Sequence, residues 1–340
     1  PGSITLAGSG VARMLTGGVN GGSSVNVSDN VVANVKLTNT LTAGWNTLAV
    51  TTGTQLTAKG NLIHDCTEAN TSSLMGLSVG VYGLGLVEGN SIYNLTVNGP
   101  SGSQTEIVGM DLHGGSAGVN VTKNRIYNIS NLNAGLWARI KGIQISSPNC
   151  ALTNNIISLG GNSGNQVSIT GIENHRYSNT NYFDHNSVLI SGASSTGTNN
   201  TFCFKNSEDY SGPSNVILRD NIFTNTRSGP GKHYTIGLTD LTGTQISDYN
   251  YLYTVTGPLA VWGTSDQANL SAWKAASGQD ANSISTDPAF TSVNNLLPTN
   301  ASMGKAGTFL SSIPVDFTGA LRSDPPDQGA YEFTLIPFVT

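Results

Sequence analysis

Charged residues are scarce in this sequence. They make up 10% of its 340 residues, whereas an average soluble protein has about 25%. The formal net charge is −5, so the chain lacks the excess of Lys and Arg that nucleic acids and anionic membranes attract. No apolar run approaches the ~18–20 residues of a membrane-spanning helix. We therefore expect no nucleic-acid partner and no insertion into a membrane.

Cysteine is rare as well. The three cysteines, Cys66, Cys150 and Cys203, are too few and too widely separated for a disulfide framework or a zinc site. We expect them to be small buried side chains. The sequence also lacks the closely spaced aspartates of a calcium-binding loop. We expect no cofactor; a structural calcium ion is compatible with the sequence, but no motif indicates one.

What the sequence does contain is a repeat. A hexamer of the form Asn-any-apolar-any-polar-apolar recurs along the chain. Its first residues are Asn30, Asn61, Asn90, Asn124 and Asn154, followed more loosely by Asn186, Asn221 and Asn250. The seven intervals are 31, 29, 34, 30, 32, 35 and 29 residues, and the apolar positions keep their register relative to Asn. A period near thirty residues predicts a solenoid.

Each repeat has the composition of strands and turns. Short alternating runs rich in Val, Ile and Thr are separated by Gly, Ser and Asn. Three such runs fit in each repeat, as in residues 109–113, 119–122 and 124–129. We therefore predict an all-β chain that forms a right-handed parallel β-helix of eight to nine coils, stacked about 4.8 Å apart.

The repeated Asn has a structural role in this prediction. At the same bend of every coil, its side-chain amide can hydrogen-bond to the Asn above and the Asn below, which forms an Asn ladder. The apolar residue two positions later, such as Ile92, Ile126 or Ile156, is expected to point into the core. We interpret these asparagines as architecture and not as ligands.

The last quarter of the chain departs from the repeat. In residues 266–278, Leu270, Trp273 and Ala276 have helical spacing, and Gly278 is a helix stop signal. We predict a short helix that covers the open end of the coils, where exposed strand edges would otherwise promote aggregation.

These features suggest one domain. We expect residues 1–333 to form it, with coils at about 10–258 and a C-terminal cap and closing segment at about 259–333. Residues 334–340 would begin a linker or tail. The abrupt, strand-like start of the sequence suggests a processed end or a piece of a larger protein.

The C-terminal motif resembles a known family. The sequence "VDFTGALRSDPPDQGAYEF" at 315–333, preceded by "DPAF" at 287–290, is similar to the end of secreted bacterial right-handed β-helix proteins of the pectate-lyase-like superfamily. The resemblance implies this fold, a secreted or cell-surface location, and a monomer within a larger multidomain protein. It implies less about activity, because that superfamily contains lyases, hydrolases, carbohydrate-binding modules and adhesins.

One predicted strand face gathers charge. The outward positions of the strands that begin with Gly contain Asp111, His113, Glu173, His175 and Lys205, with Arg176 beside them. We expect this strip to contact a ligand, with His113 and Arg176 among the binding residues. The same register places Phe202 inward. An outward strand face is polar in any case, so a purely structural role remains an alternative.

The charged strip also supports the alternative that the protein is an enzyme. The candidate catalytic residues are then Asp111, Glu173, His175 and Lys205. Asp111 and Glu173 lie two coils apart, about 9–10 Å, near the upper limit for inverting glycosidases. A basic side chain beside a carboxylate could instead promote β-elimination of a uronate. The tripeptide at 139–141 resembles polygalacturonases, but the Asn-Thr-Asp and Asp-Asp motifs that those enzymes need are missing.

A column of aromatic residues supports a binding function. His64, Tyr93 and Tyr127 follow the repeated Asn by three positions and are expected to stack on the outside of consecutive coils. The ~4.8 Å spacing is close to the length of one sugar unit, so each ring could carry a sugar. Trp137 and Tyr182, in or near predicted turns, could line the rim of a groove. Alternatively, stacked rings only stabilise neighbouring strands.

These observations favour an extracellular, non-catalytic β-helix module that binds a polysaccharide, with a plant cell-wall glycan such as xylan or pectin as the ligand class. A polysaccharide lyase or glycoside hydrolase that uses the charged strip is the first alternative. A structural stalk or adhesin repeat of a larger cell-surface protein is the second.

Overall fold

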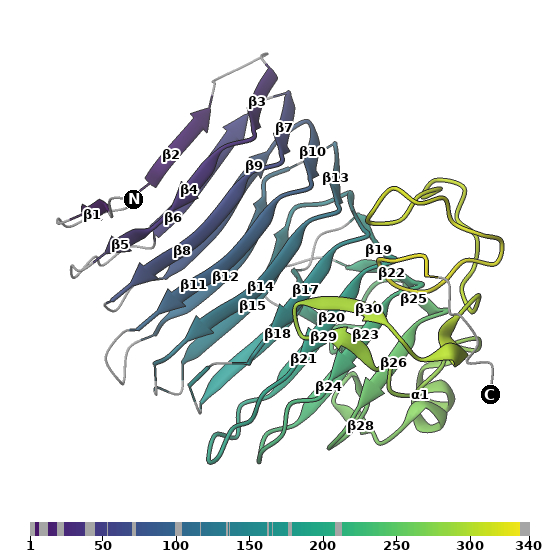
Figure 1. The fold of residues 1–340 in the computed structure, drawn as a ribbon. Helices are drawn as coiled ribbons and strands as arrows, with labels where there is room; N and C mark the ends of the chain where they lie inside the picture. Colours follow the sequence, from purple (N-terminus) through teal and green to yellow (C-terminus); the bar gives the residue numbers. More distant parts are fainter. Residues whose placement is uncertain are drawn as a thin grey trace, which may run out of the picture.

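Three strands alternate with bends along each repeat, and each strand pairs in parallel with its counterpart one repeat later (Figure 1). The computed structural model describes residues 4–6, 13–18, 24–37, 45–52, 54–69, 73–98, 104–115, 117–133, 135, 137–161, 163–164, 166–175, 179–207 and 213–333. The result is a right-handed parallel β-solenoid with Asn ladders and one short helix, so the predicted fold class is confirmed.

The first sheet has ten strands and contains the longest ones; we call it the long-strand sheet. Its strands are β2 (Arg13–Gly18), β6 (Trp45–Thr52), β9 (Leu74–Val81), β12 (Glu106–His113), β15 (Ala138–Ser146), β18 (Val167–His175), β21 (Thr201–Ser207), β24 (His233–Leu238), β27 (Ala260–Trp262) and β28 (Ser265–Gln267). All neighbours pair in parallel except β27 and β28, which are antiparallel.

The second sheet has eight strands and precedes the repeated Asn in each coil; we call it the eight-stranded sheet. Its strands are β3 (Ser24–Ser28), β7 (Gln55–Lys59), β10 (Leu84–Glu88), β13 (Gly118–Thr122), β16 (Cys150–Thr153), β19 (Thr180–Asp184), β22 (Asn215–Arg219) and β25 (Gln245–Asp248).

The third sheet follows the repeated Asn and has ten strands; we call it the post-Asn sheet. Its strands are β1 (Ile4–Leu6), β4 (Val31–Ala33), β5 (Val35–Leu37), β8 (Leu62–Glu68), β11 (Ser91–Val97), β14 (Arg125–Asn131), β17 (Ile156–Leu159), β20 (Ser187–Ile190), β23 (Ile222–Asn225) and β26 (Tyr251–Thr254). The inward side chains of the three sheets form one continuous apolar core along the solenoid.

The Asn ladder runs through the bends between the second and third sheets. Asn124 shows the pattern: its Oδ1 accepts hydrogen bonds from the backbone N–H and the Nδ2 of Asn90, at 3.0 and 2.8 Å. Its own Nδ2 donates to the Val87 carbonyl at 2.9 Å and to Asn155 Oδ1 at 3.0 Å. Each buried amide therefore satisfies backbone groups as well as its neighbours.

The ladder corrects one position of the predicted repeat. Asn155 belongs to it, donating to Asn186 Oδ1 at 2.9 Å, whereas Asn154 precedes it with a φ of 56°. The residue before the ladder Asn has positive φ in other coils too, as at Lys123, and Asn tolerates that conformation well. Because two asparagines are adjacent here, the sequence did not show which of them belongs to the ladder. Ile157, and not Ile156, points into the core.

The regular part of the solenoid is shorter than predicted. The buried ladder residues are Asn61, Asn90, Asn124, Asn155, Asn186, Asn221 and Asn250. They enclose about six turns, against the eight to nine coils expected from the sequence. The difference is minor, because the prediction also counted the less regular coils at the two ends.

A column of glycines bends the long strands. A Cβ on Gly142 would lie 2.5 Å from the Gly171 carbonyl oxygen and 2.6 Å from Ile157 Cγ2, so the position admits no larger side chain without a shift. The bend places two successive residues, Gly142 and Ile143, on the inner side and changes the alternation beyond them. In β21, Cys203 takes the glycine position and is buried in the core.

The C-terminal part begins with the predicted helix, α1 (Leu270–Ser277). Asn269 caps its N-terminus by accepting from the Ala272 N–H, and Gly278 ends it with a φ of 70°. Trp273 is fully buried and packs edge-on against Trp262 of β27, with ring centroids 5.6 Å apart. The helix therefore closes the C-terminal end of the core, and no helix of the described residues is long and apolar enough to span a membrane.

After α1 the chain folds back along the solenoid. This C-terminal strap, residues 290–333, contains β29 (Phe290–Ser292), β30 (Asn295–Pro298) and the 3-10 helix η1 (Ala301–Met303). Its Leu296 and Ala330 pack on Ile156 and Leu189, which face outward from β17 and β20. The strap therefore covers the outer side of the post-Asn sheet over its C-terminal coils, as the light green and yellow segment shows in Figure 1.

Candidate functional site

The charged strip lies on the outer face of the long-strand sheet. The register aligns Asp111 with Gln144, Gln144 with Glu173, and Glu173 with Lys205 on successive strands. His113 aligns with Ser146, and His175 with Ser207, two residues further along their strands. Five of the predicted site residues thus share one face, whereas Arg176 lies outside the described residues.

The centre of this face is Lys141, which the sequence interpretation passed over. Its Nζ lies 2.8 Å from Glu106 Oε1 and 2.7 Å from Glu173 Oε2, and it donates to Gln144 Oε1 at 2.5 Å. Gln144 Nε2 in turn donates to Asp111 Oδ1 at 3.1 Å. A continuous polar network therefore connects the carboxylates that were expected to act as a pair.

The two histidines bind the carboxylates of their own strands. His113 Nδ1 lies 3.0 Å from Asp111 Oδ2, and His175 Nε2 lies 3.5 Å from Glu173 Oε2. Each pair is two residues apart on one strand, so both side chains project from the same face. The histidines therefore support the ends of the network.

The protonation state of Glu173 bears on catalysis. Burial raises the pKa of this carboxyl, but the hydrogen bond from His175 and the charge of Lys141 outweigh burial and hold the pKa at about 2. Burial lowers the pKa of Lys141, and the charges of Glu173 and Glu106 more than compensate, so its pKa is raised. Glu173 is consequently ionised and Lys141 protonated at neutral pH. Glu173 is therefore not in the protonated form that a general acid requires, and Lys141 is not in the neutral form that a general base requires.

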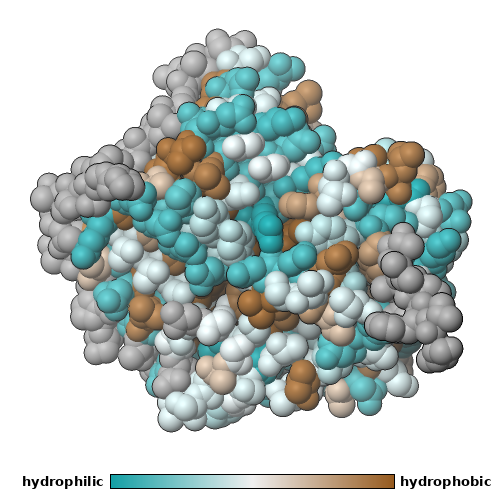
Figure 2. Space-filling model, in the orientation of Figure 1, coloured by the Kyte–Doolittle hydropathy of each residue, from teal (hydrophilic) through white to brown (hydrophobic). Residues whose placement is uncertain are grey.

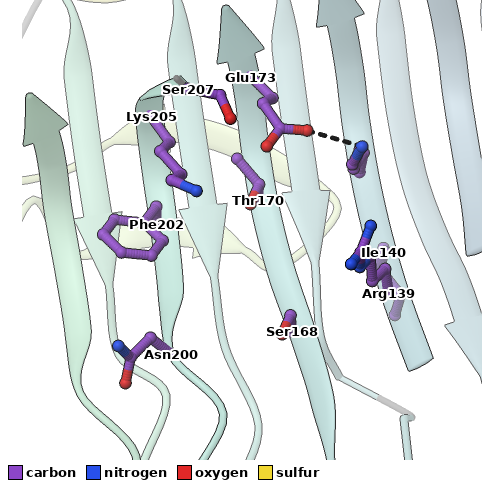
Figure 3. A pocket seen from close by; sticks show the side chains of 10 residues that line it. Arg139, Ile140, Ser168, Thr170, Glu173, Asn200, Phe202, Lys205 and Ser207 are labelled. Carbon is purple, nitrogen blue, oxygen red and sulfur yellow. Dashed lines mark ion pairs between the residues drawn. The ribbon is translucent and has the colours of Figure 1, made fainter. Parts of the chain in front are cut away.

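Beside the network the sheet is hollowed. A cleft of about 370 Å³, which we call the sheet cleft, opens over β15, β18 and β21. Hydroxyl and amide groups line it together with the ion pair of Lys141 and Glu173 and with two further cations, Arg139 and Lys205 (Figure 3). In the described part of the chain, no carboxylate forms an ion pair with either cation.

Phe202 also lines the sheet cleft, which corrects the predicted inward orientation. It pairs in register with Thr170, which pairs with Lys141, and all three face outward. Its ring stacks on Tyr234 of the next coil at 4.8 Å, and Lys205 Nζ lies 5.8 Å from the ring centroid. The bend at the glycine column causes the error. Phe202 was expected inward because Phe204, two residues later, points inward, but the bend lies between them and shifts the alternation.

The aromatic column forms as predicted, and its three rings stack on one another. The rings of His64 and Tyr93 lie 4.9 Å apart at 4°, and those of Tyr93 and Tyr127 lie 4.9 Å apart at 11°. The guanidinium of Arg125 lies 5.1 Å from the Tyr127 centroid. Both faces of Tyr93 are thus covered, so one sugar cannot stack on each ring as expected. Ligand binding by His64, Tyr93 and Tyr127 stays a prediction.

Of the two aromatic residues expected in or near turns, Trp137 and Tyr182, only Trp137 lies in one. Trp137 lies in the turn before β15 and is 55% exposed. With Arg139 it lines a smaller hollow of about 160 Å³ next to the sheet cleft. Tyr182, by contrast, lies within β19 and not in a turn.

Elsewhere the surface is mixed, and the described residues form no metal cluster. On the face shown in Figure 2, hydrophobic side chains form separate patches among hydrophilic ones. Among the described residues, no three His, Cys, Asp or Glu side chains are grouped as a metal site would require. Cys66, Cys150 and Cys203 are all buried and reduced, and burial raises the pKa of each thiol.

Comparison with known proteins adds no family. No protein-family model matches the chain, and no curated protein matches it. The fold and the site therefore define a class: a parallel β-solenoid with a cationic, hydroxyl-lined cleft on the outer face of one sheet.

Proposed function

We propose that this protein binds an extended, uronate-containing polysaccharide in the sheet cleft and does not cleave it. The observation that carries the proposal is the pair Arg139 and Lys205, two cations without an acidic partner in the described part of the chain, in one cleft lined by hydrogen-bonding groups. Pectin-type chains and glucuronate-bearing xylans fit this chemistry. A secreted or cell-surface location, which the family resemblance implies, belongs to the same proposal.

The shape of the cleft suits a chain of sugars. Arg139 aligns with Ser168 on the next strand, and the same row continues to Asn200 one coil further. Lys205 lies five residues after Asn200, toward the far end of β21. The two cations therefore lie at diagonally opposite ends, with Ser168, Thr170 and Asn200 available to sugar hydroxyls between them. Carboxylates on the ligand can pair with the cations while neutral groups bind the intervening ring.

Trp137 extends the surface at the Arg139 end. Its half-exposed indole stands beside the cleft in the adjoining hollow. An aromatic side chain at the rim supplies apolar contact for a sugar ring with little loss of side-chain entropy. A chain that leaves the cleft on this side can continue across it.

The charge states of Glu173 and Lys141 favour binding without cleavage. Glu173, whose pKa is about 2, cannot protonate a glycosidic oxygen at neutral pH. Lys141 is protonated and bound by Glu106 and Glu173, so it cannot remove the proton that uronate β-elimination requires. The network serves instead as a rigid floor for the cleft.

The test is retardation in native gels that contain polygalacturonate, glucuronoxylan or a neutral glucan. We expect retardation by the acidic polymers, weakened at least tenfold by Lys205→Ala and by Arg139→Ala, and weakened by added salt because ion pairs carry the binding. Lys36→Ala, which removes an exposed lysine from the post-Asn sheet, is the matched control and should bind as the unmodified protein does.

Parallel assays for unsaturated uronate and for new reducing ends should stay at background. Turnover that Glu173→Gln abolishes would overturn the non-catalytic proposal in favour of the enzyme. Retardation by no glycan at all would favour the stalk or adhesin. Equal retardation of Lys205→Ala and Lys36→Ala would move the site away from the sheet cleft.

A further inference from the structure

The outer face of the eight-stranded sheet carries a groove that the sheet cleft does not involve. One row of outward positions runs across it, and its members are Leu86, Asn120, Ala151, Tyr182, Ile217 and Ile246. Two hollows, of about 520 and 590 Å³, meet at Ala151 and Tyr182. We call the combined depression the Tyr182 groove.

Tyr182 differs from the other outward aromatics of the solenoid. Its side chain is 39% exposed, and its neighbours in register are Ala151 and Ile217, neither of which has a ring. Among the described residues no ring stacks on it, whereas Tyr93 is covered on both faces. Because Ala151 ends at Cβ, it leaves the space beside the tyrosine ring unfilled.

That unfilled space corresponds to the place of a stacked ring in other rows of the solenoid. Where rings occupy neighbouring coils elsewhere in this protein, they stack at 4.8–4.9 Å and nearly parallel, as Phe202 does on Tyr234. The place above Ala151 is the equivalent place next to Tyr182. A sugar ring is a slab of similar thickness with an apolar face, so it can take the position that an aromatic side chain takes in the other rows.

The groups around this space are mostly neutral. Thr180, Asn179 and Asn215 line one hollow, and Asn120 and Thr122 line the other. These side chains offer donors and acceptors that match sugar hydroxyls. The site therefore carries the two elements of neutral-sugar recognition, an aromatic ring and uncharged hydrogen-bonding groups.

Most charges near the groove neutralise one another. Arg219 donates two hydrogen bonds to the Asp184 carboxylate, at 2.9 and 2.8 Å, and Glu88 pairs with Lys59 at 2.8 Å. Lys123 is the one lining group with a charge that has no ionic partner in the described part of the chain. This contrasts with the sheet cleft and its two unpaired cations, so the two surfaces select different ligands.

One wall of the groove is the C-terminal strap. Pro314 and Val315 line it, and Asn154 holds this part of the strap by donating to the Val315 carbonyl at 2.9 Å. Arg322 Nη2 donates to Asn154 Oδ1 at 2.7 Å. The wall is therefore fixed to the body of the solenoid, and a preformed groove binds without the cost of ordering a loop.

We propose that the Tyr182 groove is a second glycan site, in which an uncharged hexose or pentose ring stacks on Tyr182 above Ala151. The site lies on a different sheet from the sheet cleft and does not depend on it. A single stacked ring with a few hydrogen bonds implies dissociation constants of about 0.1–10 mM.

The test uses xylohexaose and cellohexaose as probes, titrated into the intact protein and followed by calorimetry and saturation-transfer NMR. Tyr182→Ala should weaken binding of the better probe at least tenfold, and Tyr182→Phe should retain most of it, because the ring and not the hydroxyl carries the contact. Ala151→Phe should also abolish binding, since the new ring fills the sugar position by stacking on Tyr182. Tyr253→Ala, which removes a ring from β26 of the post-Asn sheet, should bind normally.

The outcomes separate this proposal from the sheet cleft. Lys205→Ala should lose polygalacturonate binding and keep xylohexaose binding, and Tyr182→Ala should do the reverse. Unchanged binding in both Tyr182→Ala and Ala151→Phe, or no binding of either probe up to about 10 mM, overturns the proposal. Circular dichroism of each variant confirms that it is folded, and Ala151→Phe adds a side chain on the surface without removing any contact.

Discussion

At the scale of single residues, the protein depends on buried polar groups that satisfy one another. The Asn124 side chain makes four hydrogen bonds, and two of them are with the buried backbone groups of Asn90 and Val87. An Asn at this bend therefore contributes more to stability than a hydrogen bond between two side chains does. Its loss leaves backbone groups without partners in the core.

Asn124→Ala should lower the free energy of unfolding by about 3 kcal/mol, since it leaves a buried donor and a buried acceptor unsatisfied. Urea denaturation followed by circular dichroism measures the change. Asn120→Ala, at an exposed position of β13, is the control and should change stability by less than about 0.5 kcal/mol. Similar losses in the two variants would show that the ladder contributes little.

Glu173 should make the protein acid-sensitive in a defined range. Its pKa in the folded state is about 2, below the ~4.3 of an unfolded glutamate. The unfolded chain therefore binds this proton first as pH falls. The contribution of Glu173 to stability is complete only above about pH 5 and is lost as pH falls from there to about 2.

Glu173→Gln should flatten this part of the stability curve. Comparison of urea midpoints between about pH 2 and pH 5 measures it, and the unmodified protein should lose on the order of 2–3 kcal/mol more than the variant over this range. Parallel curves for the two proteins would contradict the ionised state assigned to Glu173.

At the scale of elements, the bends decide which side chains reach each face. The glycine column lets β9, β12, β15 and β18 turn within a continuous sheet, and the residues after it alternate in a new phase. Lys141 lies before the bend and Glu173 after it, on neighbouring strands. Their ion pair forms across the bend, which is why it was not predicted.

Gly142→Ala should therefore be strongly destabilising. The added methyl group would meet the Gly171 carbonyl and the Ile157 side chain, and overpacking of this kind costs about 1–3 kcal/mol. Gly115→Ala is the matched control, because a Cβ there meets nothing within 4 Å. A thermal melt of both variants would refute the crowding argument if they unfolded at the same temperature.

The strap is a second element whose contribution can be measured. Leu296 is fully buried against Ile156 and Leu189, so Leu296→Ala should cost about 2–4 kcal/mol. Val293, 56% exposed on the same strap, gives a control substitution, Val293→Ala, that should be nearly neutral. If the two variants are equally stable, the strap is not part of the cooperative core.

At the scale of the whole molecule, the solenoid is a rigid support with three sheet faces of different character. The long-strand sheet carries the sheet cleft, the eight-stranded sheet carries the Tyr182 groove, and the post-Asn sheet is covered by the strap over its C-terminal coils. One continuous packed apolar core joins the two open faces.

Binding at the two faces should consequently be independent. The dissociation constant of xylohexaose, measured by calorimetry, should be the same with and without a saturating oligogalacturonate, because coupling requires that one ligand change the conformation seen by the other. A change larger than about threefold, corresponding to roughly 0.65 kcal/mol, would indicate that the solenoid transmits a structural change between its sheets.

The sequence alone determined the fold, the ladder and the order of the strands. Its period of about thirty residues repeats the same local signals, and parallel stacking of equal units places each residue beside its counterpart one repeat later. The column of His64, Tyr93 and Tyr127 and the common face of Asp111 and Glu173 follow from this rule. Prediction succeeded wherever the register ran without interruption.

Only the tertiary structure decided which contacts these residues make. Two adjacent asparagines hid the ladder position at Asn155, and the bend at the glycine column reversed the expected side of Phe202. The ion pairs of Lys141, the coverage of Tyr93 on both faces and the open space beside Tyr182 depend on side-chain reach between coils. These are properties of pairs some thirty residues apart, and a change of one residue in a bend moves a side chain to the other face of its sheet.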